Sequence, residues 1–351
     1  MKYQSLTIEN FRGIKKLKID DLKRVNLLVG RNNCGKTSVL EAAFMLSGMS
    51  TAIVPIQIQS FRELKVVAEK DILSLFKELD PNKQIFLEGN LDNKQRSLTI
   101  EPFYTDDNAQ DLKKHKVHSN YVTSTVSERL IQGIKLDCRD NKNNLIHRGR
   151  LYIKRQEEYA QVSSSYKETL KCLFLPSKMF IEKMIRTLND LMVEKKLDPI
   201  ISVLQKIEPN ITDIRIGAKN IIYIDVGGNN LLPINIMGDG MIRILTFLTS
   251  LADTKNGVVL IDEIENGLHY SSMNIAWNAI LTACKAYNVQ LIATTHSYEA
   301  IEALSNAYAE IEPQGDDIRL YRLDKDGENH KAYSASARAL EAGIEKDFEV
   351  R

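Results

Sequence analysis

Hydrophobic and polar positions at the start of the chain follow the patterns of β-strands and then of a helix. Residues 3–9 and 14–19 alternate apolar and polar positions and predict two strands, and the mostly apolar segment V-N-L-L-V at 25–29 predicts a short buried one. Residues 39–46 carry apolar side chains at helical spacing and predict a helix that stops near Gly48. The first fifty residues therefore predict three strands followed by a helix.

The pattern is weaker between residues 50 and 170. Helical spacing at 72–79 ends at Pro81, and alternating segments follow it. These segments, each predicted to be a strand, lie at 84–88, 97–103, 131–137 and 144–154. A polar loop at 105–120 interrupts them. We expect this region to form an antiparallel β lobe.

Strands alternate with helices in the rest of the chain. After a return to the core at 173–177, helices at 178–195 and 199–207 predict an inserted helical lobe. The remaining elements are predicted, in order, as strands at 211–216 and 221–226, a helix at 239–253, a strand at 258–261, a helix at 271–286, a strand at 290–293, a helix from 297 and a strand at 318–323. Alternation of this kind implies a largely parallel sheet.

The composition is that of a soluble globular protein. Of 351 residues, 43% are hydrophobic and 26% are charged, and the length corresponds to about two domains or to one large domain with an insertion. The 47 Lys and Arg residues nearly balance the 46 Asp and Glu residues, which leaves a net charge of +1. No global positive field is therefore available for nucleic acid, and any polyanion must be held at a local site.

Cysteine usage and hydropathy exclude several classes of protein. The four cysteines make no C-x-x-C pair, which argues against a disulfide framework and against a zinc site. The first residues contain no apolar run, so no secretory signal is expected. No apolar run approaches the ~20 residues that span a bilayer. We expect a cytoplasmic protein with no place in a membrane.

Residues 30–37 read G-R-N-N-C-G-K-T and fit the phosphate-loop pattern G-x-x-x-x-G-K-[ST]. A predicted strand precedes them and a predicted helix follows, which favours such a loop over a chance glycine turn. Its backbone N–H groups and the helix N-terminus bind phosphate oxygens, while the lysine reaches the β- and γ-phosphates and the threonine hydroxyl binds Mg²⁺. The residues expected to contact nucleotide are Gly30, Asn32, Asn33, Cys34, Gly35, Lys36, Thr37 and Ser38.

Two acids follow the apolar strand predicted at 258–261. Such a strand directs the residues after its C-terminal end toward the nucleotide crevice. We expect Asp262 to hold Mg²⁺ together with Thr37, and Glu263 to orient and deprotonate the attacking water. A simple cap on the strand is the alternative for the acid pair alone. His296 ends a later strand in the same way and is expected to contact the γ-phosphate. The predicted catalytic residues are therefore Lys36, Glu263 and His296.

Together these segments resemble the ABC-type ATPase heads of the SMC, RecF and OLD (overcoming lysogenization defect) group. The resemblance lies in L-T-I-E-N-F-R-G at 6–13, G-R-N-N-C-G-K-T-S-V-L-E at 30–41, I-D-E-I-E-N-G-L-H at 261–269 and T-H-S at 295–297. It implies an α/β fold, namely an ABC-type P-loop ATPase head with a mixed sheet, an antiparallel β lobe and an inserted helical lobe.

The resemblance also implies a division of the chain. The core is expected to comprise residues 1–50 and 172–325, with the helical lobe at 178–208. Residues 51–171 are expected to form a β-rich insertion, and 326–351 a C-terminal tail. OLD nucleases carry a Toprim nuclease domain after the ATPase, and the stretch after Leu304 is too short for one. We therefore expect no nuclease in this chain.

In this group two heads enclose two ATP molecules, and a signature loop from the partner completes each site. The matching segment is I-M-G-D-G-M at 236–241, where Met237 takes the place of the usual serine. The resemblance implies that Gly238, Asp239 and Gly240 contact the nucleotide. An ordinary glycine-rich helix start is the alternative.

Two further residues are candidates for the same site. Ser177 follows a predicted strand and is the candidate for the loop residue that contacts the metal. Arg12 follows the first strand and is a candidate nucleotide contact, although a surface arginine accounts for it equally well. Glu265 and Asn266 fall at the position of the loop that faces the opposite monomer.

The leading hypothesis is an ATPase that uses ATP and Mg²⁺ and works as a homodimer or higher homo-oligomer. Its nucleotide state would control a separate effector, such as a nuclease or toxin, as in bacterial anti-phage systems related to the OLD group. The absence of an N-K-x-D sequence favours ATP over GTP.

Two alternatives stay open. A RecF-like DNA-repair ATPase would bind duplex DNA in an ATP-gated way, using the lysine-containing clusters at 113–116 and 195–196. A scaffold without turnover would use ATP only to join its subunits. Met237 in the signature position favours that scaffold, and Glu263 argues against it.

Overall fold

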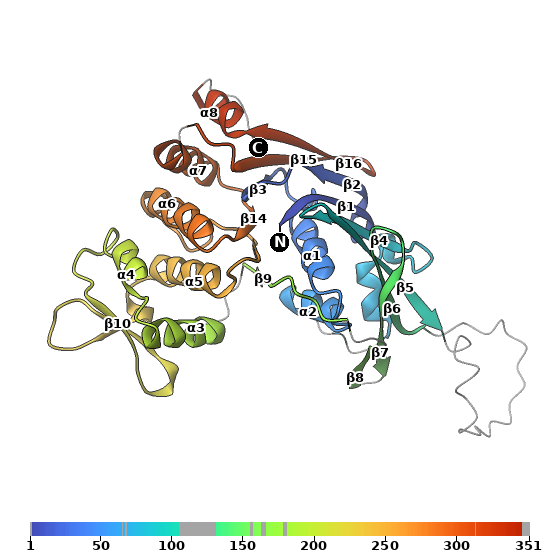
Figure 1. Ribbon diagram of the computed structural model, residues 1–351, viewed down its shortest axis with the longest axis horizontal. Helices are drawn as coiled ribbons and strands as arrows, with labels where there is room; N and C mark the ends of the chain where they lie inside the picture. The colour runs from blue at the N-terminus through green and yellow to red at the C-terminus, as the bar shows by residue number, and fades with distance from the viewer. Residues whose placement is uncertain are drawn as a thin grey trace, which may run out of the picture.

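The computed structural model describes residues 2–64, 66, 69–104, 131–154, 157–162, 166–177, 181–312 and 314–345. The polar loop predicted at 105–120, with its cluster at 113–116, lies outside these residues, as do the predicted helix start at 178–180 and the last six residues of the chain. The described strands form three sheets, and helices cover or separate them (Figure 1).

A six-stranded sheet in the order β16-β15-β3-β14-β13-β9 forms the centre of the fold. Its strands are β3 (Val25–Val29), β9 (Cys172–Leu175), β13 (Val258–Ile261), β14 (Gln290–Thr294), β15 (Ile318–Asp326) and β16 (Asn329–Ser336). All neighbouring pairs are parallel except β15 with β16. Every residue of β3, β13 and β14 is buried, which explains why these segments are mostly apolar in sequence. The predicted parallel sheet is confirmed.

A seven-stranded antiparallel sheet packs beside it, in the order β2-β1-β4-β5-β6-β7-β8. Its strands are β1 (Tyr3–Phe11), β2 (Ile14–Asp20), β4 (Ile85–Leu91), β5 (Lys94–Tyr104), β6 (Ile131–Arg139), β7 (Leu145–Lys154) and β8 (Glu157–Val162). Because β1 pairs with β4, the strands predicted as an insertion at 51–171 extend a sheet that the first twenty residues begin.

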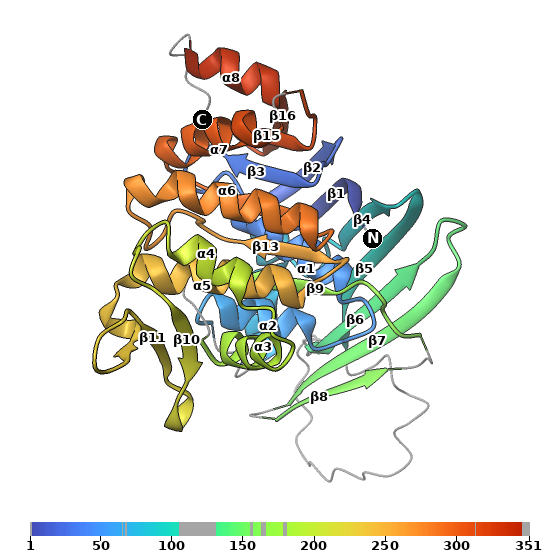
Figure 2. The same ribbon diagram turned by 60° about the vertical axis from the view of Figure 1, so that its left-hand side comes forward.

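The helices are α1 (Lys36–Ser47), α2 (Val54–Phe61), α3 (Ile181–Val193), α4 (Asp198–Leu204), α5 (Asp239–Asp253), α6 (Tyr270–Ala286), α7 (Tyr298–Ile311) and α8 (Ala337–Glu345). Figures 1 and 2 show α5, α6 and α7 side by side. Alternate residues of β3 enter two cores: Val25, Leu27 and Val29 pack with the α5–α7 side, whereas Leu28 packs with α1 and the antiparallel sheet. Helix α1 therefore lies between the two large sheets.

The predicted helical segment at 72–79 is instead 3₁₀ structure. Residues Glu69–Leu75 and Lys77–Leu79 form two such turns, η1 and η2. Glu78 and Leu79 have φ values of 58° and 60°, in the left-handed region, so an α-helix cannot continue through them. The helical spacing here reflects burial of Ile72 and Leu75 in the core under the antiparallel sheet rather than an α-helix.

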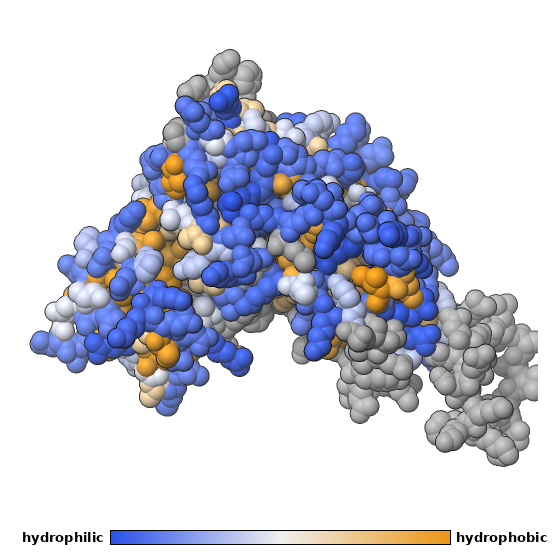
Figure 3. Space-filling model, in the orientation of Figure 1, coloured by the Kyte–Doolittle hydropathy of each residue, from blue (hydrophilic) through white to orange (hydrophobic). Residues whose placement is uncertain are grey.

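The helical lobe carries the third sheet, in the order β10-β11-β12. It consists of β10 (Asp213–Ile216), β11 (Ile222–Asp225) and β12 (Leu232–Pro233), with the 3₁₀ turns η4 (Ala218–Asn220) and η5 (Ile234–Ile236). On the face in Figure 3, hydrophobic residues form small patches among hydrophilic ones, several of them over this side of the molecule. Lys196, one of the lysines proposed for DNA, pairs with Glu194 at 2.7 Å.

The segment predicted as a C-terminal tail is folded as far as residue 345. Strand β16 pairs with β15 through a turn at Gly327, whose φ is 57°, and α8 follows directly. Leu340 of α8 is buried in the core shared with α5–α7, so this segment is part of the packed structure. Among the helices of the described ranges, none has the length and apolar character required to cross a membrane.

Candidate active site

The phosphate loop connects β3 to α1. Gly30, Asn33 and Gly35 have φ values of 134°, 62° and 98°, which curl the backbone between strand and helix. A Cβ atom at Gly30 would lie 2.4 Å from the carbonyl oxygen of Leu323 on β15, so the loop approaches that strand too closely for a side chain. The glycine pattern therefore has a steric cause in the structure.

Lys36 is the first residue of α1 and folds back over its own loop. Its Nζ donates to the carbonyl oxygens of Gly30 at 2.8 Å and Arg31 at 3.1 Å, and lies 3.9 Å from Cys34 Sγ. Burial lowers the pKa of Lys36. Its ammonium is thus held at the loop by carbonyl groups that anionic oxygens can replace. Cys34 is 3% exposed and fills space under the loop.

Other predicted contacts of the loop differ in exposure. Asn32 and Asn33 are exposed at its tip, while Ser38 is buried in the first turn of α1. A cavity of about 550 Å³ lies beside the tip, between residues 31–34 and residues 322–326 of β15. Loop and strand therefore form the walls of one depression.

Thr37 and Asp262 meet at the C-terminal edge of the parallel sheet. Thr37 Oγ1 lies 3.1 Å from both carboxylate oxygens of Asp262, and Thr294 Oγ1 donates to Asp262 Oδ1 at 2.7 Å. Asp262 is 8% exposed. Burial raises the pKa of Asp262, and the hydrogen bonds from Thr294 and Thr37 offset this only in part.

These two side chains fit a magnesium ion. A buried carboxylate whose charge is disfavoured gains from an adjacent cation, and Mg²⁺ prefers oxygen ligands from one or two protein groups together with phosphates. No group of three or more His, Cys, Asp or Glu side chains in the described part of the chain could hold a metal by itself. The donor set therefore suits a metal that arrives with a phosphate ligand.

Glu263 adopts a left-handed backbone conformation, with φ at 51°. Its N–H donates to Thr294 Oγ1 at 2.8 Å, and its Oε2 accepts from Asn266 Nδ2 at 2.6 Å. The Arg243 guanidinium donates to its carbonyl oxygen at 3.1 Å. The strained turn is therefore held at its amide, its carbonyl and its side chain.

His296 follows β14 and is exposed. Its Nδ1 lies 3.4 Å from Lys36 Nζ, and its backbone N–H donates to Glu265 Oε1 at 2.7 Å. The structure thus brings Lys36, His296 and the acid-bearing turn after β13 to one edge of the sheet. A phosphate group at the loop would lie among a cation, an imidazole and two carboxylates.

The segment in the signature position lies against the turn after Glu263. A Cβ atom at Gly240 would be 3.3 Å from the carbonyl oxygen of Gly267, and one at Gly267 would be 3.6 Å from Asp239 Cβ. Gly238 has a φ of 91° and open space around it. Ile236, just before it, is 66% exposed, so this segment presents backbone and an apolar side chain to solvent.

Ser177 and Arg12 have different surroundings. Ser177 lies two residues after the end of β9, the strand next to β13, and its carbonyl accepts from Arg243 Nη1 at 3.3 Å. The Arg12 guanidinium donates to Glu41 through Nε at 2.6 Å and to Gln59 at 3.1 Å. These partners account for Arg12 without a nucleotide, and its predicted contact stays a prediction.

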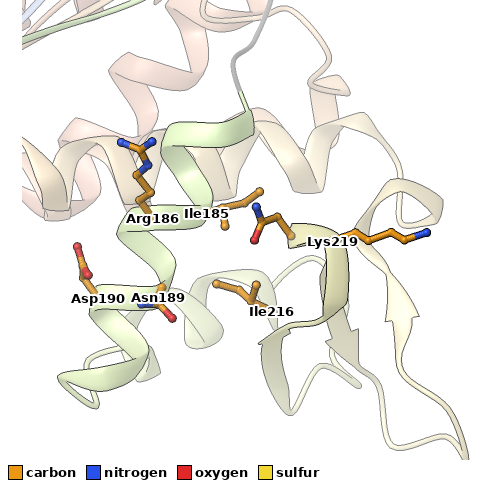
Figure 4. Close-up of a pocket in the computed structure, with 7 residues that line it drawn as sticks. Ile185, Arg186, Asn189, Asp190, Ile216 and Lys219 are labelled. Carbon is orange, nitrogen blue, oxygen red and sulfur yellow. The ribbon is translucent and has the colours of Figure 1, made fainter.

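A second cavity, of about 650 Å³, lies on the helical lobe between α3 and the turn after β10. Figure 4 shows Ile185 and Ile216 at this space, with the amino group of Lys219 pointing away from it. None of the residues that line it belongs to the predicted site. The phosphate loop thus has its own depression, separate from this one.

Sequence patterns missed the residues that hold the site in place. Thr294 bridges Asp262 and Glu263, and Arg243 binds backbone carbonyls at the same turn. Thr294 stands two residues before His296 at the end of a strand, and this position is the only sequence feature that indicates a role for it. No sequence feature indicates a role for Arg243, because every residue has a backbone carbonyl and its partners therefore cannot be recognised in a sequence.

Comparison with known proteins gives one family match and several partial relatives. The model of the family described as "AAA domain, putative AbiEii toxin, Type IV TA system" matches residues 25–302. A Helicobacter pylori (strain ATCC 700392 / 26695) protein named ATP/GTP phosphatase is 27% identical over an alignment of 336 residues, and 88% of each chain is covered. The DNA replication and repair protein RecF of Clostridioides difficile (strain 630) is 51% identical over 47 residues, 13% of each chain.

Among solved structures, the chain resembles an Smc head bound to the C-winged helix domain of ScpA. The TM-score is 0.51 at 10% identity, with 98% of this chain and 100% of that chain covered. At this identity the likeness shows the fold alone. The predicted fold class, an α/β ABC-type ATPase head with a mixed sheet and an antiparallel lobe, is confirmed.

Proposed function

The chain belongs to the family described as AAA domain, putative AbiEii toxin, Type IV TA system, and on this premise we propose that it is a magnesium-dependent ATPase. The proposal rests chiefly on one observation: Lys36, Thr37, Asp262, Glu263 and His296, far apart in sequence, lie together at the C-terminal edge of β3, β13 and β14. Fold likeness alone does not give an activity, and this set of groups is what supports the proposal.

Binding begins at the phosphate loop. Lys36 exchanges the carbonyls of Gly30 and Arg31 for phosphate oxygens, and the loop amides with the α1 N-terminus bind the remaining oxygens. Thr37 and Asp262 would hold a magnesium ion, which would neutralise charge on the phosphate oxygens. The buried carboxylate of Asp262 would then face a cation.

Hydrolysis requires a base and a fixed geometry. Glu263 accepts the proton of the attacking water, with its backbone held by Thr294 and Arg243. Asn266 donates to the Glu263 carboxylate, so a water molecule must share or replace that hydrogen bond. His296 contacts the γ-phosphate from the side of Lys36.

Gly238, Asp239 and Gly240 supply the nucleotide contacts of a second copy of the chain. Open backbone at Gly238 and the exposed side chains of Ile236 and Tyr270, 66% and 71% exposed, support a protein-covered surface at this place. Two heads would then enclose nucleotide at a homodimer interface. Its formation and release would control a separate effector protein, and the resemblance to the OLD group supports a role in anti-phage defence.

Phosphate release from Mg-ATP tests the activity. We expect wild-type protein to release phosphate and Glu263→Gln to lose about 10²–10⁴-fold in kcat while retaining ATP binding. Glu302→Gln, which changes an exposed glutamate on α7, is the matched control and should behave as wild type. No phosphate from wild type, with ATP still raising the molecular mass in light scattering, would favour the scaffold instead.

The defence role needs its own test. The gene with its neighbours is expressed in a phage-sensitive host, and plaque formation is compared for wild type, Glu263→Gln and Glu302→Gln. Protection that depends on Glu263 alone supports an ATP-controlled effector. Equal plaque counts in all three would remove the defence role and leave the ATPase untouched.

A further inference from the structure

Arg243 is a buried arginine whose hydrogen bonds go to backbone carbonyls. It lies on α5 and is 3% exposed, with its guanidinium carbon 5.0 Å from the centre of the Phe247 ring. Nη1 donates to the carbonyl of Ser177 at 3.3 Å, and Nη2 donates to those of Asp262 at 3.4 Å and Glu263 at 3.1 Å. Its Nε has no hydrogen-bond partner.

The carbonyls that it binds belong to two neighbouring strand ends. Ser177 follows β9, and the Asp262 and Glu263 carbonyls follow β13, which pairs with β9. The Asp262 N–H also donates to the Leu175 carbonyl at 2.9 Å, so these strand ends are already joined. Arg243 adds a third element, α5, to this junction.

An arginine is a costly way to fill this position. Burial of a guanidinium with an unpaired N–H is unfavourable, and an apolar side chain of similar length would pack beside Phe247 at less cost. An arginine at position 243 therefore indicates a role that requires its hydrogen-bond donors and that an apolar side chain could not fill. Two nitrogens of the guanidinium together bind three carbonyl oxygens, and the rigid fork of arginine, unlike an ammonium, fixes the directions of these hydrogen bonds.

Arg243 helps to hold the backbone conformation of Glu263. Its φ of 51° is unfavourable for a glutamate and persists only because neighbours hold it. Thr294 holds its N–H from β14, and Arg243 holds its carbonyl from α5. If α5 shifts along its axis, the carbonyl contact changes while the Thr294 contact does not, and the peptide after Glu263 turns.

The N-terminus of α5 is the Gly238–Gly240 loop, three to five residues from Arg243. One turn of helix separates them, so a movement of the loop reaches the guanidinium directly. We propose that Arg243 is a positioning residue that couples this loop to the orientation of Glu263. Engagement of the loop by a nucleotide or a second copy then sets the base for hydrolysis. This inference rests on the proposed ATPase.

Arg243→Lys is the test variant, because a lysine keeps the charge and loses the fork. Arg319→Lys is its control, since Arg319 is also buried, at 8% exposure, but binds Asp21 and Asp316 away from the site. We expect Arg243→Lys to lower kcat about 10- to 100-fold with the Kd for Mg-ATP unchanged, and Arg319→Lys to leave kcat near that of wild type. Arg243→Met serves as the second variant if the lysine variant fails to fold.

Hydrogen exchange on nucleotide-free protein gives a readout that does not need activity. We expect amides at 262–266 to exchange faster in Arg243→Lys than in wild type, and no such change in Arg319→Lys. Asp239→Ala should add less to Arg243→Lys than to wild type, because both act through α5.

The outcomes separate the two proposals. If the wild-type protein releases no phosphate, the proposed ATPase activity is wrong. The hydrogen-exchange result then still tests whether Arg243 holds the segment at 262–266. Unchanged kcat and unchanged exchange at 262–266 in Arg243→Lys would overturn the coupling and leave the ATPase standing. Equal losses of kcat and of melting temperature in both lysine variants would make Arg243 a packing residue only.

Discussion

Thr37 Oγ1 lies 3.1 Å from both carboxylate oxygens of Asp262, although 225 positions separate the two residues in the chain. The contact joins the first turn of α1 to the end of β13. A threonine hydroxyl beside a buried carboxylate is the arrangement at which we propose that Mg²⁺ binds. The two proposed ligands thus already lie together in the structure.

Asp262→Asn should stabilise the nucleotide-free protein at neutral pH. Burial raises the pKa of Asp262, so the folded protein binds this proton more tightly than the unfolded chain. Stability is therefore lost as pH rises from the unfolded pKa of about 3.9 through the folded pKa. An asparagine removes that loss. Melting temperatures at pH 7 should be higher for the variant, and the difference should disappear below pH about 4.

Mg-ATP provides the control for this substitution. Bound ligand stabilises wild type by mass action, while the variant has lost a magnesium ligand. We expect the order of melting temperatures to reverse when Mg-ATP is added. A variant less stable than wild type without nucleotide would contradict the assignment of an uncompensated buried charge.

Thr294→Val should damage catalysis more than nucleotide binding. The hydroxyl accepts from the Glu263 N–H at 2.8 Å and donates to Asp262 at 2.7 Å, and valine keeps the shape while losing both bonds. We expect kcat to fall about tenfold or more and stability to fall by about 1–3 kcal/mol. Thr294→Ser should restore kcat in steady-state assays.

Thr249→Val is the matched control, because Thr249 is buried on α5 and donates only to carbonyls of its own helix. Its kcat should stay near that of wild type. A loss of kcat as large as that of Thr294→Val would mean that any buried threonine substitution disturbs the enzyme.

Arg12→Met should lower the stability of the protein and leave its affinity for nucleotide unchanged. Glu41 is fully buried and accepts from Arg12 Nε at 2.6 Å and Arg62 Nε at 2.5 Å. Removal of Arg12 leaves that carboxylate half-paired, and we expect the free energy of unfolding in urea to fall by about 3 kcal/mol.

Arg62→Met should cost less, because the Arg62 side chain is 36% exposed and water can take its place. If instead Arg12→Met raised the Kd for ATP at unchanged stability, Arg12 would be a nucleotide contact, as its place after the first strand suggested.

Gly30→Ala should weaken nucleotide binding. The new Cβ would lie 2.4 Å from the Leu323 carbonyl oxygen at a φ of 134°, so loop and β15 must separate. We expect a cost of about 1–3 kcal/mol and a rise of at least tenfold in the Kd for ATP, measured by calorimetry. Gly13→Ala, with no atom within 4 Å of the new Cβ, should change neither quantity.

The sequence carries most of this site because the phosphate loop and the acid pair are local patterns. Residues 30–37 needed only a strand before and a helix after, and both are present. Asp262 and Glu263 follow an apolar strand, and the parallel pairing of β13 with β14 brings them to the edge that His296 shares. The roles of these residues stay predictions until the variants are measured.

Other features depend on contacts that no local pattern records. The 3₁₀ turn at 77–79 contains Glu78 and Leu79 in left-handed conformations, and neither side chain type predicts such a conformation. The pairing of β1 with β4 crosses some eighty residues, so a boundary at residue 50 could not reveal that both regions share one sheet. Arg243 stayed hidden because its partners are carbonyls.

The central position of β3 has a consequence for synthesis on the ribosome. Its neighbours in the sheet are β14 and β15, and Asn26 bonds to Leu291, 265 positions later. Translation adds about 5–20 residues per second, so the neighbours of β3 are synthesised on the order of 10–50 s after it. Meanwhile β1 and β2 can pair at once as a hairpin. A nascent chain stalled before residue 290 therefore has β3 without either of its sheet neighbours, and the phosphate loop after it lacks the strand that positions it.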